Sequence, residues 1–224
     1  MKKLSIGTLL IVGSCLTGQT LAQPPAPLIV KITGITDGSP IPPKFAYCTS
    51  DGKGRTKNGD NISPAIIWSD APVQTKSYAL IVVDPDVPTS FDAANKPDKV
   101  LPVVFPRQNF YHWVLIDIPA QVTGILEGKD SSGITAGGKP VGRTDYGTNG
   151  VNGYGFGGYD GPCPPWNDER LHHYHFTVYA LDVASLHLPD PVNGQLAQSA
   201  MTGHILAQSE VVGTYTTNPT GVRR

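Results

Sequence analysis

The sequence predicts a turn-rich, all-β protein. Its 224 residues include 21 prolines and 25 glycines, and only 16% of them are charged. This composition favours a β protein with many turns over a helical bundle. Short apolar stretches bounded by these turn residues recur along the chain, as expected for strands. About 200 residues remain after a predicted leader, a size that suits one all-β domain.

The first 22 residues have the order of a secretory signal peptide. A basic start, Met1-Lys2-Lys3, precedes the mainly apolar stretch 4–16, and Thr20-Leu21-Ala22 ends in a small residue. The apolar stretch is too short to span a bilayer. We expect cleavage after Ala22, a periplasmic or secreted mature chain 23–224, and no transmembrane segment in it. The alternative is a lipoprotein signal that lipidates Cys15.

The charge balance argues against a general nucleic-acid binder. Without Lys2 and Lys3, 15 basic residues face 18 acidic ones, a net charge of about −3 with histidine neutral. Nucleic-acid-binding domains are usually strongly basic.

Two cysteines remain in the mature chain, Cys48 and Cys163. In an oxidising compartment they can pair, and we expect this disulfide because of the compartment. The alternative is a pair of buried, free thiols.

The predicted strands follow the apolar pattern along the chain. The stretch 76–83, KSYALIVV, is almost uninterruptedly apolar, which indicates a strand buried on both faces in the middle of a sheet. Pro85 and Pro88 follow this stretch and should end the hydrogen bonding of the strand. The other predicted strands are 28–32, 65–68, 112–118 and 173–181.

A long connection, 89–109, follows the first buried strand, and 100–105 in it is a candidate short strand. Loops this long are usually functional or disordered. Residues 161–165, GPCPP, form a rigid loop that leads into the strand 173–181.

In that last strand, one face carries Tyr174, Phe176, Val178 and Ala180, and the other carries the remaining side chains, His173 and His175 among them. Towards the C-terminus we expect a helix over 194–208 and a loose tail over 216–224.

Polar residues gather where three of the predicted strands begin or end. Asp84 and Asp86 follow one strand, His112 begins the next, and His172 and Tyr174 begin a third. If these strands are neighbours, the residues form a small pocket with backbone N–H groups around Gly161 and Cys163. Cationic imidazoles and fixed N–H groups suit a phosphate or carboxylate.

Each of these residues also has a purely structural interpretation. Asp84 can cap a turn, and His112 can be a core histidine with its hydrogen bonds satisfied. A metal site is a further alternative, since His173 and His175 share one strand face and His112 or Asp84 could add a ligand. Common hydrolase and phosphotransferase motifs are absent from the sequence, which lowers the expectation of an enzyme.

A set of short motifs runs in one order along residues 44–215: Asp60-Asn61-Ile62-Ser63-Pro64, Trp68, Thr75-Lys76-Ser77, Asp84-Pro85-Asp86-Val87-Pro88, His112-Trp113-Val114, Gly161-Pro162-Cys163-Pro164-Pro165, Leu171-His172-His173-Tyr174 and Tyr179-Ala180-Leu181-Asp182. In this order they resemble the phosphatidylethanolamine-binding protein family, also called Raf-kinase-inhibitor-like proteins, in its bacterial exported branch. The resemblance implies a β-sandwich in which a large central antiparallel sheet is flanked by a smaller sheet and a few peripheral helices. It also implies a single such domain over 23–224.

The resemblance further implies an anion pocket for phosphate-type or phospholipid-headgroup ligands. The implied ligand-binding residues are Asp84, Asp86, His112, Gly161, Pro162, Cys163, Pro164, Pro165, His172 and Tyr174. No shared catalytic step, cofactor or metal is implied. We therefore expect a non-enzymatic binding protein for a small phosphorylated or carboxylated ligand. The alternatives are a module that inhibits a protease or other enzyme through 89–109, and a metal-dependent hydrolase that uses His112, His173 and His175.

Three departures from the family pattern bear on this pocket. The connection before His112 is long, the glycine-rich run before Tyr159 is extended, and 166–170, WNDER, replaces the usual Lys-Gly start after the prolines. A lysine beside an anion pocket adds attraction, so its loss reduces the expected headgroup affinity.

Overall fold

The computed structural model describes residues 27–221. The predicted signal peptide, the candidate lipidation site Cys15 and residues 222–224 lie outside this range. Along the described chain the elements are β1 (Ile29–Ile32), a 3₁₀ helix η1 (Pro43–Phe45), β2 (Cys48–Ser50), β3 (Thr56–Asn58), β4 (Ile66–Ser69), β5 (Ser77–Pro88), β6 (Arg107–Pro119), β7 (Gly124–Ile125), β8 (Gly142–Arg143), β9 (Thr148–Asn149), β10 (His172–Leu181), α1 (Gly194–Met201) and β11 (Ile205–Tyr215).

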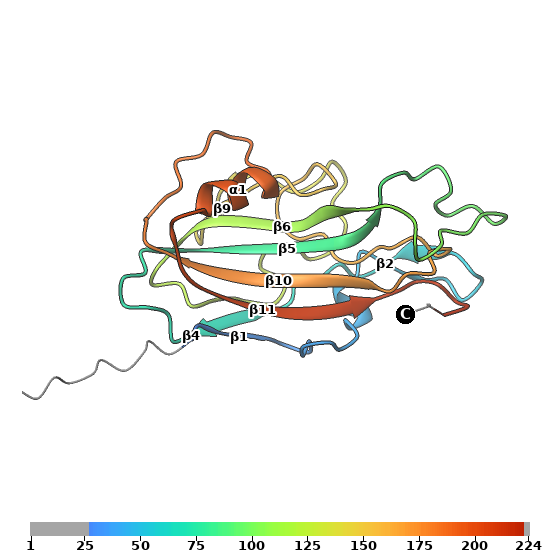
Figure 1. Cartoon of the computed structure of the whole chain (residues 1–224), viewed down its shortest axis with the longest axis horizontal. Coiled ribbons are helices and arrows are strands. Elements are labelled where there is room, and N and C mark those ends of the chain that lie inside the picture. The colour runs from blue at the N-terminus through green and yellow to red at the C-terminus, as the bar shows by residue number, and fades with distance from the viewer. Residues whose placement is uncertain (1–26, 222–224) are drawn as a thin grey trace, which may run out of the picture.

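The strands form a large sheet, a smaller sheet and one hairpin. The large sheet has the order β11-β10-β5-β6-β9-β8, and the small sheet has the order β1-β4-β7. All pairings between these strands are antiparallel. Figure 1 shows β1 and β4 below the large sheet and α1 above it. The predicted sandwich is therefore confirmed.

The position of β5 explains its continuous apolar sequence. Tyr78, Leu80 and Val82 belong to the core between the two sheets. Ala79 and Ile81 lie in a second core on the opposite face, where Ala197 and Met201 of α1 also pack. A strand in the centre of the large sheet must be apolar on both faces, as the pattern predicted.

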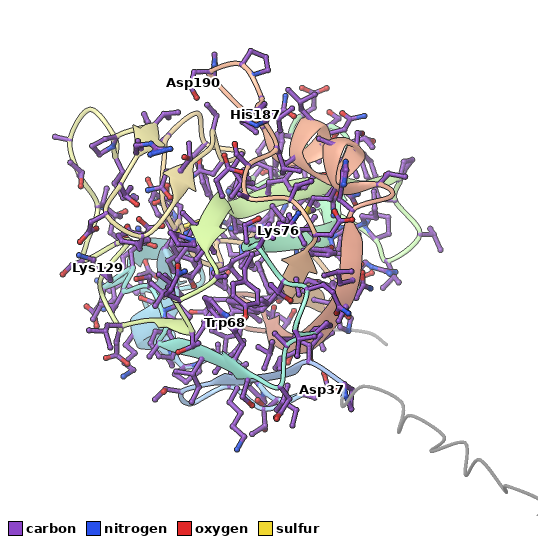
Figure 2. All side chains as sticks on the ribbon, turned by 90° about the vertical axis from the view of Figure 1, so that its left-hand side faces the viewer. Asp37, Trp68, Lys76, Lys129, His187 and Asp190 are labelled. Carbon is purple, nitrogen blue, oxygen red and sulfur yellow. A yellow bond between two sulfur atoms is a disulfide. The ribbon has the colours of Figure 1, made fainter. Side chains whose placement is uncertain are left out.

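Figure 2 views the sandwich from one end and labels one side chain in its core and several near its surface. Trp68 of β4 is buried between the two sheets. Lys129 and Asp190 lie near the outline of the molecule, on loops. Among the described residues, no helix is long and apolar enough to cross a membrane.

Several sequence-based boundaries were wrong. Strand β5 does not stop at its first proline but continues to Pro88, because Pro85 lies where the pairing with β6 shifts register between Asp84 and Val87. A proline at such a bulge removes no ladder hydrogen bond. The expected strand over 100–105 is absent, and Leu101 makes only an isolated bridge to Asp168.

The C-terminal region differs most from the expectation. The predicted helix over 194–208 begins as expected, with Asn193 accepting a hydrogen bond from the Leu196 N–H at 2.9 Å. It ends at Met201, since Gly203 adopts φ +86° and turns the chain into β11. The tail is also tied down at its start, because the Thr217 hydroxyl donates to the Pro164 carbonyl at 2.8 Å.

Candidate functional site

A cavity of about 110 Å³ lies at the end of the large sheet where β5 ends and β10 begins. Strands β10, β5 and β6 are neighbours there, as the pocket hypothesis required. The cavity is lined by Asp84, Val87, Phe91, Phe110, His112, Tyr154, Cys163, Pro164, Pro165, His172 and Tyr174. Most of these side chains are apolar, so a few polar groups determine what the cavity can recognise.

The structure brings most of the predicted site residues together around this cavity. Asp86, Gly161 and Pro162 do not line it. The Gly161 N–H donates to the Asn61 side chain at 2.8 Å, and a Cβ at Gly161 would lie 1.9 Å from the Phe45 carbonyl oxygen. The expectation that this N–H group holds an anion is therefore wrong, because close packing against Phe45 and Asn61 is its role.

The ring of His112 is buried and oriented by the backbone. Its Nδ1 lies 2.7 Å from the Asp160 carbonyl oxygen. A carbonyl can only accept, so Nδ1 carries the proton and donates it. Burial lowers the pKa of His112, although the negative charge of Asp84 opposes this effect. The imidazole is therefore neutral near pH 7, and its Nε2 has no hydrogen-bond partner among the described residues.

Tyr174 stands beside His112, with ring centroids 5.0 Å apart. Its hydroxyl is fully buried and has no hydrogen-bond partner in the described part of the chain. Burial, with Asp84 nearby, raises the pKa of Tyr174 well above its usual range, so the hydroxyl keeps its proton. A buried hydroxyl without a partner is costly, which points to a ligand or water that accepts from it.

His172 differs from His112 because both of its ring nitrogens are occupied. Nδ1 lies 2.6 Å from Asp84 Oδ2, and Nε2 lies 3.2 Å from Asp168 Oδ2. Burial alone would lower its pKa, but Asp84 and Asp168 outweigh this and raise the pKa of His172 to about 9. The imidazolium is therefore held by two carboxylates. The expectation that His172 is a free cationic donor for a ligand is wrong.

The charges around His172 alternate and cancel. Asp168 accepts two hydrogen bonds from the Arg107 guanidinium, at 2.6 and 3.0 Å. Burial would raise the pKa of Asp168, yet His172 and Arg107 lower it below its usual value. The row Asp84, His172, Asp168 and Arg107 therefore carries two negative and two positive charges. This row, the paired network, supplies no net positive charge to the cavity.

Asp86 does not line the cavity and interacts with a second set of charged groups. It pairs with the Arg170 guanidinium and lies 2.7 Å from His173 Nδ1. Burial would raise its pKa, but His173 and Arg170 lower it. His175 lies 3.2 Å from Glu210 instead. His173 and His175 thus have separate acidic partners, and no group of metal-ligating side chains occurs within residues 27–221.

Two departures from the family pattern hold each other in place. The buried Asn167 of the WNDER segment donates to three carbonyl oxygens of the preceding loop, those of Ala93, Lys96 and Lys99. It also accepts from the Asn95 N–H at 2.8 Å. The loop 89–106 extends from the end of β5 at the right of Figure 1. The Asn167 side chain holds it together with backbone hydrogen bonds of Leu101 to Asn167 and Glu169.

The disulfide expected between Cys48 and Cys163 is present and joins β2 to the proline loop. Cys163 itself lines the cavity. The Cys48 N–H also donates to the Pro162 carbonyl at 3.0 Å, so the two segments are connected by the backbone as well. One wall of the cavity is therefore fixed covalently.

Sequence reasoning missed several residues that shape the site. Phe110 lies two positions before His112 in β6, so the alternation of a strand could have placed it on the same face. Tyr154, whose ring packs against Phe110 and His112, lies in an irregular loop that gives no periodic signal. Asp168 and Arg107 are 61 positions apart, and only the folded chain brings them together.

Comparisons with known proteins agree with this geometry. The model of a family described as "Phosphatidylethanolamine-binding protein" matches residues 31–216. A UPF0098 protein of Aquifex aeolicus is 35% identical over 192 residues, which cover 84% of this chain and 96% of that protein. The UPF0098 protein YbhB of Escherichia coli K12 is 30% identical over 185 residues, or 81% of this chain and 95% of YbhB.

Solved structures extend the comparison to the fold. The crystal structure of E. coli YbcL, described as a new member of the mammalian PEBP family, has a TM-score of 0.63 and 27% identity, covering 85% of this chain and 99% of YbcL. A PEBP homologue from Chlamydia trachomatis has a TM-score of 0.60 and 31% identity, covering 84% of this chain and 97% of its own.

Proposed function

Because the chain belongs to the phosphatidylethanolamine-binding protein family, we propose that it is a non-enzymatic binding protein whose cavity holds a small phosphate-type group. The group belongs either to a free metabolite or to a phospholipid headgroup. One observation carries this proposal: His112 Nε2 and the Tyr174 hydroxyl have no hydrogen-bond partner among residues 27–221, at a small, mostly apolar cavity. Polar groups left unpaired in such a place are recognition groups.

The apolar part of the cavity supports the same assignment. Phe91, Phe110 and Pro165 line the cavity beside the side chains that would contact the ligand, so those side chains have apolar neighbours. In such surroundings a hydrogen bond to a charged oxygen is stronger than in water. The proposed role requires no covalent step, and none of the residues at the cavity is needed as a nucleophile.

We test the proposal by titrating O-phosphoethanolamine into the mature protein and following the histidine ring signals by NMR. Saturable shifts confined to His112 and His172 are expected. The His172 shift should be lost in His112→Ala, and both shifts should need a higher ligand concentration in Tyr174→Phe. His204, which pairs with Asp182 on the surface, is the internal control. Unchanged His112 signals at millimolar ligand would contradict the proposal.

We also propose that the mature chain works outside the cytoplasm. The Cys48–Cys163 disulfide supports this, because such bonds persist in oxidising compartments. Cell fractionation and N-terminal sequencing of the expressed full chain test it. A mature protein that begins at Gln23 in the exported fraction is expected, whereas a lipidated Cys15 or an intact N-terminus in the cytoplasm would refute it.

The loop 89–106 favours a second candidate function, that of a protein-interaction module. It exposes three large apolar side chains, those of Phe91, Val100 and Val104, while Asn167 hydrogen-bonds to its backbone. An ordered loop with exposed apolar groups is typical of a contact surface. Replacing 92–106 by a short turn, which keeps the cavity residue Phe91, should abolish capture of a partner such as an exported protease and leave phosphate binding intact.

A further inference from the structure

The hairpin of β2 and β3 carries a cluster of positive charge. Lys53, Arg55 and Lys57 are exposed, and none of these side chains forms an ion pair in the described part of the chain. The acidic residue of the hairpin, Asp51, accepts at Oδ1 from the backbone N–H groups of Lys53 and Arg55, at 2.7 and 3.0 Å. With three basic side chains and one acidic one, the hairpin is net positive, although the predicted mature chain is net negative.

The pairing of the hairpin turns this charge away from the body of the protein. Cys48 is buried and bonded to Cys163, so its face of the hairpin points toward the proline loop. Lys57 lies opposite Thr49, the position after Cys48, so its side chain is on the other face. That face is therefore open to a partner from solution.

The hairpin and the loop 89–106 border the same cavity. The hairpin is bonded to Cys163, the loop contains Phe91, and both of these residues line the cavity. Figure 1 shows the two segments protruding at the right-hand end of the molecule. The loop adds apolar side chains to that end, among them Val100 with 58% and Val104 with 90% of its surface exposed. One end of the protein thus presents positive charge and apolar groups together.

We propose that this end of the protein docks on the surface of an anionic phospholipid bilayer. Each basic side chain near such a surface increases the affinity roughly fivefold. Apolar side chains become buried at the boundary between headgroups and acyl chains. A soluble polyanion would satisfy only the charges, whereas a bilayer satisfies both groups. The hairpin responds to surface charge and not to one headgroup, so the inference goes beyond the proposed function and does not depend on what the cavity holds.

Flotation of the mature protein with vesicles tests this inference. Vesicles of phosphatidylglycerol and phosphatidylcholine should bind the protein. Vesicles of phosphatidylethanolamine and phosphatidylcholine have no net charge and should bind it at least about tenfold more weakly. Binding to the anionic vesicles should also weaken as salt is added. Equal binding to both kinds of vesicle, or no binding to either, would overturn the inference.

Substitutions in the hairpin test where the attraction originates. The triple variant Lys53→Gln, Arg55→Gln and Lys57→Gln should bind the anionic vesicles on the order of a hundredfold more weakly than the wild type.

The matched control removes three exposed positive charges elsewhere, through Lys31→Gln, Lys76→Gln and Arg143→Gln. Lys76, labelled in Figure 2, immediately precedes β5 and so lies at the end of that strand opposite the cavity. The control should keep most of the binding. An equal loss in both triple variants would show attraction to net charge alone and would overturn the inference.

Trp166 reports which end of the protein faces the bilayer. Trp68 and Trp113 are buried, whereas Trp166 is partly exposed and its backbone N–H donates to the Asn95 side chain of the loop at 3.0 Å. Vesicles with lipids brominated near the headgroup should therefore quench the fluorescence of the bound protein, and this quenching should be lost in Trp166→Phe. Binding without quenching would overturn the proposed orientation.

The apolar part of the surface has its own variant. Val100→Ser combined with Val104→Ser removes apolar contact but no charge, so vesicle binding should become weaker and more sensitive to salt. If the chain binds no vesicles and the loop captures an exported protease instead, the inference is overturned and the second candidate function stands.

Discussion

The cavity has two neighbouring histidines that the fold uses in opposite ways. His172 is charged and lies between Asp84 and Asp168, so its hydrogen-bonding capacity is fully used inside the protein. His112 is neutral. One of its nitrogens is bonded to the backbone, and the other has no partner among the residues that the structure describes. Burial is nearly the same for both. Pairing, rather than residue type or position, therefore separates the structural histidine from the recognition histidine.

The strongest test of this contrast removes a carboxylate from the paired network. Asp168→Asn leaves the Arg107 guanidinium and the His172 imidazolium without their shared negative partner, at a site where both are largely buried. We expect a loss of about 3–5 kcal/mol in the free energy of unfolding, measured with urea. The matched control is Asp145→Asn, which removes the exposed partner of Lys129 and should change little. A small effect at Asp168 would mean that the network is not structural.

The next test of the contrast between the two histidines measures how the free energy of unfolding depends on pH. The pKa of His172 is raised from its ordinary 6.5 to about 9, so the stability from its charge is complete below pH 6.5 and is lost as the pH rises through 9. The wild-type protein should lose about 3 kcal/mol relative to His172→Gln over this range. Parallel pH profiles for the two proteins would show that His172 is not held charged.

The loop 89–106, which contributes Phe91 to the cavity wall, provides a further comparison. Asn167→Ala removes three hydrogen bonds to loop carbonyls and one accepted from Asn95. We expect a loss of about 1–3 kcal/mol, together with faster amide hydrogen exchange in the loop. Asn58→Ala, on the exposed hairpin strand β3, is the control. Unchanged hydrogen exchange in the loop would refute the proposed role of Asn167 in holding the loop.

The smallest expected effect on stability occurs at the recognition group. Tyr174→Phe removes a buried hydroxyl that has no hydrogen-bond partner in the described part of the chain, so the free energy of unfolding should stay within about 1 kcal/mol of the wild type or rise slightly. Phosphate binding should weaken in the same variant. A clear loss of stability would show that the hydroxyl is paired inside the protein after all.

The sequence predicted the parts of the fold that depend on local pattern. The continuous apolar run of β5 identified the central strand, and the alternation in β10 placed Tyr174 and Phe176 on the core face. The helix predicted over 194–208 was too long, because Gly203 was taken as part of an apolar helix face. In the structure Gly203 has a positive φ and follows the end of the helix. Strand β11 is half exposed at the sheet edge, so it lacked the apolar signal of the inner strands.

For the site, the sequence indicated which residues would meet but not how they would share protons. Asp84, His112, His172 and Tyr174 do line one cavity. The prediction treated both histidines as cations free to attract an anion. That error has a physical cause: Asp168 and Asp160, which decide the state of each ring, approach through irregular segments and carry no motif of their own.

The bond between Cys48 and Cys163, which lie 115 positions apart, closes the chain between them into a covalent ring. The ring contains the loop 89–106, whereas β1, β10, α1 and β11 lie on the two arms outside it. A protease that cuts the exposed loop therefore opens the ring without releasing a fragment, so the two pieces stay one molecule until a reductant acts. Such a nicked form migrates as a single species without reductant and as two species with it.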